Sequence, residues 1–156
     1  MKMKGIVPAA GLALALLASP LLANDVPGMV VKESPHSVSV TIDRLESVLE
    51  ANDIAIALRW DHASNAEDAG IPLRETELLI FGNPEVGSHF FTSAQSAGID
   101  LPLKALAWED EEGQVWLGYN DPAHIAERHG IDDRAEVVQG MSQALDNLSD
   151  AATSVD

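Results

Sequence analysis

Two of the five histidines follow segments that could place them at a ligand or metal site. Asp61 and His62 come directly after an alternating apolar stretch, so we expect both at the carboxyl end of a strand. His129 ends a short helical segment, where the helix dipole favours a protonated imidazole. If the fold brings these ends together, Asp61, His62 and His129 could form a metal or haem site. The alternative is that each histidine caps a helix or forms a hydrogen bond at the edge of the core.

The spacing of the histidines gives this metal hypothesis little further support. The paired spacings that mark zinc sites are absent from the sequence. His124 and His129 are five residues apart, which does not place them on one face of a helix. No cofactor is therefore evident from a motif, and a metal or haem remains a hypothesis that depends on the fold.

The tripeptide Gly82-Asn83-Pro84 is a second candidate site. Asn83 can cap a helix, and Pro84 suits the first helical position because its missing N–H has no partner there. The start of such a helix offers backbone N–H groups and the positive end of a dipole. A small anion or carboxylate could bind there. The alternative is an ordinary helix cap.

Nucleophilic catalysis has weaker support in the sequence. The chain contains no cysteine, no Gly-x-Ser-x-Gly elbow and no His-Glu-x-x-His pair. Ser88 and His89 are neighbours in sequence, but a catalytic triad requires a geometry that adjacency does not supply. A catalytic residue is therefore not assigned.

The elements that would position these residues can be predicted from the pattern of apolar side chains. Strands are predicted at 37–41, 54–60, 76–81, 103–108 and 115–119. Helices are predicted at 42–51, 84–97 and 124–129, and from 132 or 133 onward. Two tight strand pairs favour a mainly antiparallel sheet of about five strands with helices packed on one face, which is a two-layer α+β fold.

The segment 54–60 shows the clearest alternation in the chain. Its large side chains are Ile54, Ile56, Leu58 and Trp60. Strict alternation places such residues on one face of a strand, so the pattern predicts that this whole face turns toward the core.

The first 23 residues have the order of a secretory signal peptide. Lys2 and Lys4 precede an apolar run from Ile6 to Ala18, and a short segment then closes at the small residue Ala23. The run is shorter than the roughly 20 residues that span a bilayer. We expect cleavage near Ala23 and hence a periplasmic or secreted protein. The alternative is that the segment is retained as an anchor.

The rest of the chain is predicted to be one domain. Residues 24–36 contain Pro27, Gly28 and Pro35 with little periodicity, so they are interpreted as a tether. Residues 37–150 are the single α+β domain, and residues 151–156 are interpreted as a flexible tail. A domain of this length can fold on its core alone, without the disulfides that a cysteine-free chain cannot form.

The charge excludes some classes of partner. The chain has 9 basic and 25 acidic side chains, a net charge of −16. Loss of Lys2 and Lys4 with the signal peptide leaves 7 basic side chains against 25 acidic ones, or −18. Such a surface does not suit nucleic acid, and after signal removal it does not suit anionic lipid. The acidic side chains are scattered, which favours a role in solubility in a salty or exposed compartment. The alternative is that they attract cations or basic partners.

A series of short motifs has the order and spacing of a known family. They are Asp61-His62 with Ala66 and Gly70, 78–84, 101–103, 108–110, 113–116, 119–122 and 128–130. Together they resemble the bacterial domain of unknown function 302 family over residues 37–131. The resemblance implies a small α+β domain and no established activity. His62 and His129 lie inside the motifs, whereas the segment 85–91 departs from the usual family pattern.

Three hypotheses about function follow. The leading one is a non-enzymatic binding module for a small ligand or metal that uses Gly82, Asn83 and either His62 or His129. The second is an interaction protein that forms a homodimer through its sheet or helices and assists an envelope partner. The third is a small hydrolase or isomerase whose turnover depends on His62 or His129.

Overall fold

The computed structural model describes residues 26–155 and contains one five-stranded sheet in that range. The strand order is β1-β5-β4-β3-β2, and every neighbouring pair is antiparallel. The strands are β1 (Met29–Ser34), β2 (Ala55–Asp61), β3 (Thr76–Gly82), β4 (Leu103–Glu109) and β5 (Val115–Asn120). The helices are α1 (Val38–Ala51), α2 (His62–Asp68), α3 (Pro84–Ser93), the 3-10 helix η1 (Gln95–Ile99), α4 (Pro122–His129) and α5 (Ala135–Thr153). The predicted α+β class is confirmed.

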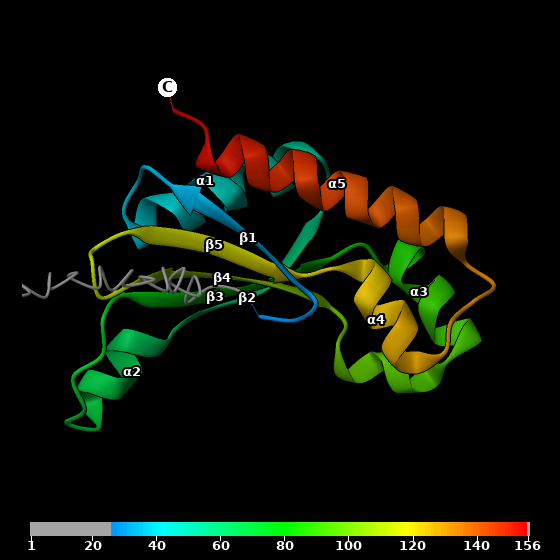
Figure 1. Cartoon of the computed structure of the whole chain (residues 1–156), viewed down its shortest axis with the longest axis horizontal. Helices are drawn as coiled ribbons and strands as arrows, with labels where there is room; N and C mark the ends of the chain where they lie inside the picture. Colours follow the sequence, from blue (N-terminus) through cyan, green and yellow to red (C-terminus); the bar gives the residue numbers. More distant parts are fainter. Residues whose placement is uncertain (1–25, 156) are drawn as a thin grey trace, which may run out of the picture.

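Helices α1 and α5 cover one face of the sheet, as Figure 1 shows. Alternate strand residues point into this layer, among them Leu79, Phe81 and Leu117. Apolar residues at helical spacing meet them from above, as Ile42 of α1 and Leu145 of α5 do. The side chains of this main core are almost fully excluded from solvent. Burial of each large apolar side chain contributes about 1.5–3 kcal/mol to the free energy of unfolding.

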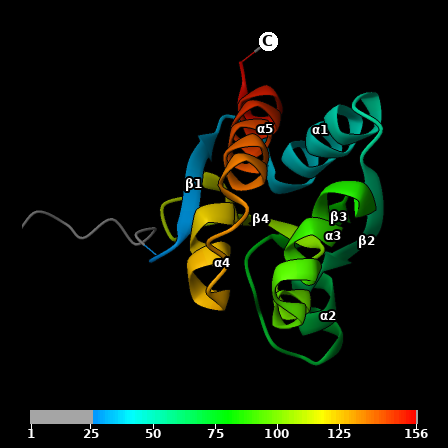
Figure 2. The same ribbon diagram turned by 90° about the vertical axis from the view of Figure 1, so that its right-hand side faces the viewer.

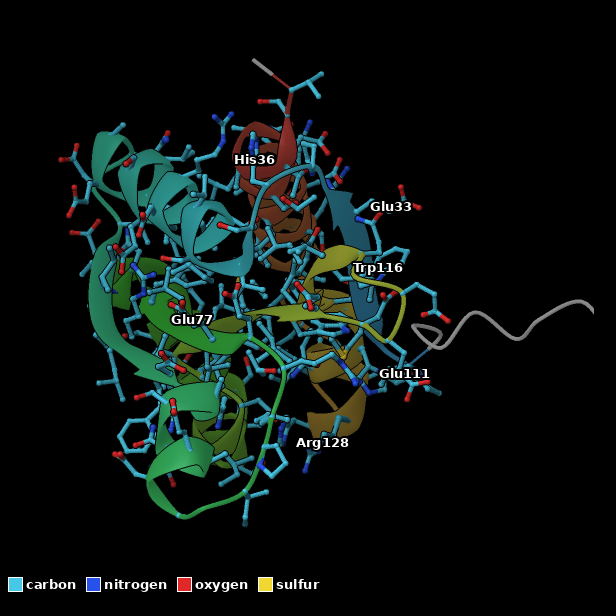
Figure 3. All side chains as sticks on the ribbon, turned by 90° about the vertical axis from the view of Figure 1, so that its left-hand side faces the viewer. Glu33, His36, Glu77, Glu111, Trp116 and Arg128 are labelled. Atoms are coloured by element: carbon cyan, nitrogen blue, oxygen red, sulfur yellow. The ribbon has the colours of Figure 1, made fainter. Side chains whose placement is uncertain are left out.

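A second, smaller core lies beyond the end of the sheet where β3 and β5 finish. It joins α3, η1, α4 and the first half of α5 (Figures 1 and 2). Phe90 of α3, Ile125 of α4 and Met141 of α5 are among its buried members. Helix α2 lies on the other side of the sheet from α1 and α5, as the end-on view shows (Figure 3).

The predicted tether and first strand are corrected by the structure. Residues 29–34 of the tether form β1, an edge strand paired with β5. The predicted strand 37–41 is instead the start of α1, where the Ser37 hydroxyl accepts a hydrogen bond from Val40 N–H. Val38 and Ile42 are buried one helical turn apart. The alternation of Val38 and Val40 is therefore a coincidence within a helix, and Val40 is 43% exposed.

The prediction that Ile54, Ile56, Leu58 and Trp60 all face the core is wrong for Leu58 and Trp60. A β-bulge interrupts the β2–β3 register between Ile56 and Leu58. Such a bulge adds one residue and reverses the faces that follow it. Arg59 therefore points under α1, and Leu58 and Trp60 point to the uncovered face, where they are 44% and 45% exposed.

The C-terminal residues differ from the predicted tail. Helix α5 continues through Thr153, and Ala152 is fully buried in the main core. Arg44 of α1 donates hydrogen bonds to the carbonyl oxygens of Ala151 and Ala152. Packing against α1 therefore fixes a segment whose small polar residues carry little signal. The predicted signal peptide, residues 1–23, lies outside the described residues.

Candidate functional site

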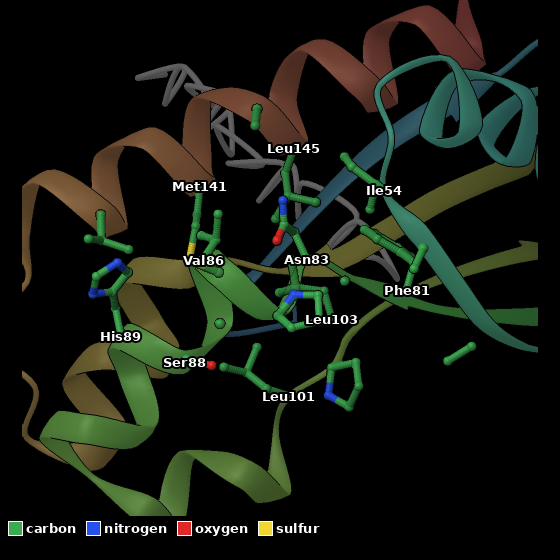
Figure 4. Close-up of a pocket in the computed structure, with 18 of the residues that line it drawn as sticks. Ile54, Phe81, Asn83, Val86, Ser88, His89, Leu101, Leu103, Met141 and Leu145 are labelled. Carbon is green, nitrogen blue, oxygen red and sulfur yellow. The ribbon is translucent and has the colours of Figure 1, made fainter.

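A cavity of about 790 Å³ opens between β2, α3 and α5 on the helix-covered side of the sheet (Figure 4). We call it the groove. Its floor is formed by the ends of β2 and β3, with Ile54, Ile56 and Phe81. Leu101, in the segment before β4, and Leu103, the first residue of β4, close one side. A cavity of this size falls in the range of small-molecule sites, which are mostly apolar and contain few polar groups.

Helix α5 forms the longest wall of the groove. The wall residues recur at helical spacing, and they are Val137, Gly140, Met141, Ala144, Leu145 and Leu148. Gly140 and Ala144 are the small members of this stripe, and a Cβ added to Gly140 would meet no atom within 4 Å. The groove therefore has room along α5 because two wall positions lack a large side chain.

Helix α3 and its cap bring most of the polar groups to a largely apolar groove. Asn83, Ser88 and His89 line it, and Figure 4 shows all three side chains beside the apolar wall. Ser88 and His89 are exposed at the rim. The arrangement suits a molecule with an apolar body and a polar end.

Two predicted site residues, Gly82 and Asn83, line this groove. The Asn83 side chain caps α3, since its Oδ1 accepts a hydrogen bond from Glu85 N–H at 2.9 Å. The N–H groups of Val86 and Gly87 donate to the Asn83 carbonyl oxygen. The first turn of α3 is therefore satisfied by Asn83 itself, and Glu85 adds a negative charge beside it.

Asp61 and His62 lie at the opposite end of the sheet from this groove. Asp61 pairs with Glu77 near the start of β3, whereas Gly82 ends the same strand. Asp61 Oδ1 accepts a hydrogen bond from Ser64 N–H at 2.8 Å, which caps α2. His62 is the first residue of that helix. The antiparallel register therefore separates His62 from Asn83 and does not unite the predicted set.

His129 lies at the same end as the groove but does not line it. Its Nδ1 is 2.9 Å from Ser96 Oγ, and its Nε2 is 2.6 Å from Asp100 Oδ2. Arg128 donates a hydrogen bond to the other oxygen of Asp100. The imidazole side chain is only 7% exposed, and both of its nitrogens have protein partners.

The Ser96–His129–Asp100 chain has the residue types of a catalytic triad but not its arrangement. In a serine-protease triad the carboxylate binds Nδ1 and the hydroxyl faces Nε2. Here the hydroxyl of Ser96 faces Nδ1 and the carboxylate of Asp100 binds Nε2. None of the three residues lines the groove. The chain instead joins η1 to the end of α4. Within residues 26–155, no group of three histidine, aspartate or glutamate side chains could hold a metal ion.

The groove was missed by the sequence analysis apart from Gly82 and Asn83. Its other residues come mainly from β2, α3, the start of β4 with the segment before it, and α5, which are far apart in the chain. One local signal was present: Gly140 and Ala144 interrupt the apolar stripe of the last helix with small residues. Such a stripe also occurs where helices pack closely, so it does not indicate a cavity without the fold.

The fold and groove define a small α+β domain with two helices over an open antiparallel sheet. The chain belongs to the family described as "Domain of unknown function DUF302", whose profile matches residues 30–148. The crystal structure of an uncharacterized conserved protein DUF302 from Bacillus stearothermophilus has the same fold. Its TM-score is 0.71 at 17% identity, with 81% of this chain and 99% of that chain covered.

Curated relatives match a shorter part of the chain. It is 45% identical over 104 residues to proteins named "Fluoride-specific ion channel FluC 1" from Brucella suis biovar 1 (strain 1330) and Brucella abortus biovar 1 (strain 9-941). The match covers 67% of this chain but 41% and 38% of those proteins, so the chain spans about two fifths of their length. In residues 26–155, no helix combines the length and apolar character needed to cross a membrane.

Proposed function

We propose that this chain is an exported, non-enzymatic binding protein for a small molecule with an apolar body and one polar end. The observation that supports the proposal is the groove, a cavity of about 790 Å³. Apolar side chains from β2, β3 and α5 form most of its lining. Burial of apolar ligand surface supplies about 25 cal/mol per Å², from which the entropy cost of association is subtracted.

The polar end of the ligand is assigned to the side of the groove formed by α3. Ser88 offers a hydroxyl and His89 an imidazole at the rim. Neutral imidazole can accept or donate a hydrogen bond, so an alcohol, a carboxylic acid or an amide could all be matched. Because Glu85 lies in the first turn of α3, the first turn itself favours a neutral group over an anion.

The test is titration of the purified chain with N-phenyl-1-naphthylamine, a neutral apolar dye that fluoresces when it leaves water. We expect saturable binding that Ala144→Trp weakens at least tenfold, because the indole would fill the space along α5. Gln143→Trp is the matched control, since Gln143 is the exposed neighbour of Ala144 and does not line the groove. Equal binding by the two variants would contradict the groove as the site.

The polar end is tested by competition with the dye. Dodecanol, dodecanoate and dodecane share a chain length and differ in their end group. We expect the alcohol to compete more strongly than the alkane, and Ser88→Ala with His89→Ala to remove the difference. Native mass spectrometry and an absorbance spectrum of the chain recovered from cells would then show whether a molecule, metal or haem is retained. A competitor order that does not depend on Ser88 and His89 would contradict the assigned polar end.

The export part of the proposal depends on residues 1–23 and has a separate test. The chain is expressed with its own N-terminus in a Gram-negative host, and its intact mass is measured in the periplasmic fraction. We expect a mature chain that begins at Asn24. Replacement of Leu14 and Leu16 by arginine would interrupt the apolar run and keep the full-length chain inside the cell. A full-length mass in the membrane fraction would instead support a retained anchor.

A further inference from the structure

The face of the sheet opposite α1 and α5 is unusually apolar. Leu79 and Phe81 of β3 are buried under the helices, so Leu78 and Ile80 point to the other face. Register pairing places further apolar side chains on this face. They are Val31 of β1, Leu58 and Trp60 of β2, Leu106 and Trp108 of β4, and Trp116 of β5. We call this surface the open face.

All three tryptophans of the chain are on the open face. Trp108 and Trp116 are directly paired across β4 and β5, and Trp60 is paired with Leu78. Trp116 is labelled in Figure 3. Trp108 and Trp116 are partly buried within the chain, whereas Trp60 is 45% exposed. Tryptophan is enriched at the energetic centres of protein interfaces, so an exposed Trp60 on this face favours a partner there.

Helix α2 and the segment that follows it form an arm beside the open face. The arm comprises residues 62–75 and lies on the side of the sheet away from α1 and α5 (Figures 1 and 3). No α2 residue is buried, and the following segment exposes 61% of Ile71 and 51% of Leu73. The arm projects beside the open face, so that the two form an L-shaped surface (Figure 1). Its apolar part consists of the open face together with Ile71 and Leu73 of the arm.

We propose that the open face and the arm bind a second copy of this chain, so that the protein is a symmetric dimer. In a two-fold arrangement the same surface faces itself. If the axis runs between the sheets and across the strands, the arm of each copy covers the far end of its partner's sheet. An L-shaped surface is complementary to itself under that rotation. The arm of each copy lies over the end of the partner's open face that has no arm of its own.

The size of the surface agrees with a dimer only when the arm takes part. Five strands at about 4.8 Å spacing and about 20 Å length give a flat footprint of roughly 500 Å². A stable interface buries about 800 Å² on each partner. The exposed helix and segment of the arm supply the missing area. A contact between the sheets alone would be too small.

Charge placement supports a second copy in this orientation. The open face has only two charged strand residues, Glu33 and Lys104, although the chain as a whole has a net charge of −16. Lys104 lies at the start of β4, the end opposite the arm, and its Nζ donates to the carbonyl oxygens of Asp100 and Pro102. The arm has exposed carboxylates at Glu67 and Asp68. In the two-fold arrangement the acidic arm of one copy meets Lys104 of the other.

The first test is sedimentation velocity of the chain as cells produce it, with its N-terminus established by mass spectrometry. We expect a dimer at micromolar concentration. Its dissociation constant should fall with added salt, because salt screens the repulsion between two acidic chains. Leu58→Asp and Ile71→Asp should each raise the dimer dissociation constant at least tenfold. Val40→Asp is the matched control, since Val40 is 43% exposed on α1, on the other side of the sheet. Circular dichroism verifies that each variant is folded.

Two further readouts establish which surface is used. Tryptophan emission should shift to shorter wavelength as wild-type protein is concentrated and should not shift in Leu58→Asp. Because the chain has no cysteine, separately purified Leu73→Cys and Lys104→Cys chains can be mixed and joined by a short bismaleimide. We expect a cross-linked pair from that mixture and none from Val40→Cys with Lys104→Cys. A single-chain mass at every concentration, or a dimer that survives either aspartate substitution in the surface, would overturn the proposal.

Discussion

Arg59 Nε lies 2.6 Å from Glu77 Oε2 beneath helix α1, where the β-bulge in β2 turns the arginine inward. Its guanidinium also donates to Asp43 of α1 at 2.6 Å. Burial alone would lower the pKa of Arg59, but the hydrogen bonds to Glu77 and Asp43 raise it above its ordinary value. This network ties the edge strand to the helix layer and keeps the arginine charged.

We expect Arg59→Met to lower the free energy of unfolding by about 2 kcal/mol. The loss follows because Glu77, only 12% exposed, would be left without its partner, and an unpaired buried charge is costly. A second substitution, Glu77→Met, should restore much of the stability. Urea unfolding of the single and double variants measures this coupling. If the double variant lost as much stability as the two single variants together, Arg59 and Glu77 would not be a coupled pair.

The hydrogen bonds of His129 lead to a second prediction, which separates a structural role from a ligand-binding one. His129→Ala would leave Asp100 without its closest partner, so we expect the free energy of unfolding to fall by about 2 kcal/mol. His62→Ala should change it by less than about 0.5 kcal/mol, because α2 buries no residue. Dye binding in the groove should be unchanged in both variants. Loss of dye binding in His129→Ala with normal stability would contradict the structural role.

The fold could be predicted from the sequence wherever one element shows a single clear period. Strands β3, β4 and β5 were placed within a residue or two, because their apolar residues end at Gly82, the acidic Gly113 turn and Asp121-Pro122. The prediction failed at β1, an edge strand whose apolar residues are only partly buried. The position of β2 was predicted within one residue, but its core face was wrong after Ile56, because a bulge reverses the alternation and leaves no composition signal.

The candidate site was less predictable, because it depends on which ends of the strands meet. Asp61-His62 and Arg128-His129 were both placed correctly at the ends of their elements. The antiparallel order β5-β4-β3-β2 then places His62 and His129 at opposite ends of the strands. Only Gly82 and Asn83, already at the groove end, line the cavity. Local pattern does not determine such a long-range placement.

Asp110 in the β4–β5 turn gives a prediction at acid pH. The Trp116 indole N–H donates to its Oδ2 at 2.7 Å and, with the N–H groups of Gln114 and Glu112, lowers the pKa of Asp110 below its ordinary value of 3.8. A depressed carboxyl pKa gives stability that is present above the unfolded-state pKa and is lost as pH falls through the folded-state pKa. Trp116→Phe should therefore weaken this part of the acid dependence.

The Asp110 prediction is measured by NMR titration of the side-chain carboxyl. We expect its pKa to rise in Trp116→Phe and to stay unchanged in Trp108→Phe, which replaces the paired tryptophan that donates no hydrogen bond to Asp110 in the structure. An unchanged Asp110 pKa in both variants would show that the Trp116 hydrogen bond does not contribute to the shift.

At alkaline pH, Tyr119 and Lys32 are expected to destabilise the fold together. Burial raises the pKa of Tyr119 above 10.0. Burial alone would lower the pKa of Lys32, but hydrogen bonds to Asp146 and Asp150 outweigh it and raise the pKa above 10.5. For both groups the folded state keeps a proton that the unfolded state releases. Their contribution is complete below the unfolded-state pKa and is lost as pH rises through the folded-state value.

The expected result is that the midpoint of urea unfolding is stable at neutral pH and falls once the pH passes 10.0, where an unfolded Tyr119 would ionise. Tyr119→Phe removes the ionisable hydroxyl, so its midpoint should fall less steeply over the same range. Lys32→Met should be less stable at neutral pH, because Asp146 and Asp150 lose their shared partner at β1. Its stability should then depend less on alkaline pH than that of the wild type. Parallel alkaline curves for the wild type and both variants would show that other groups control the transition.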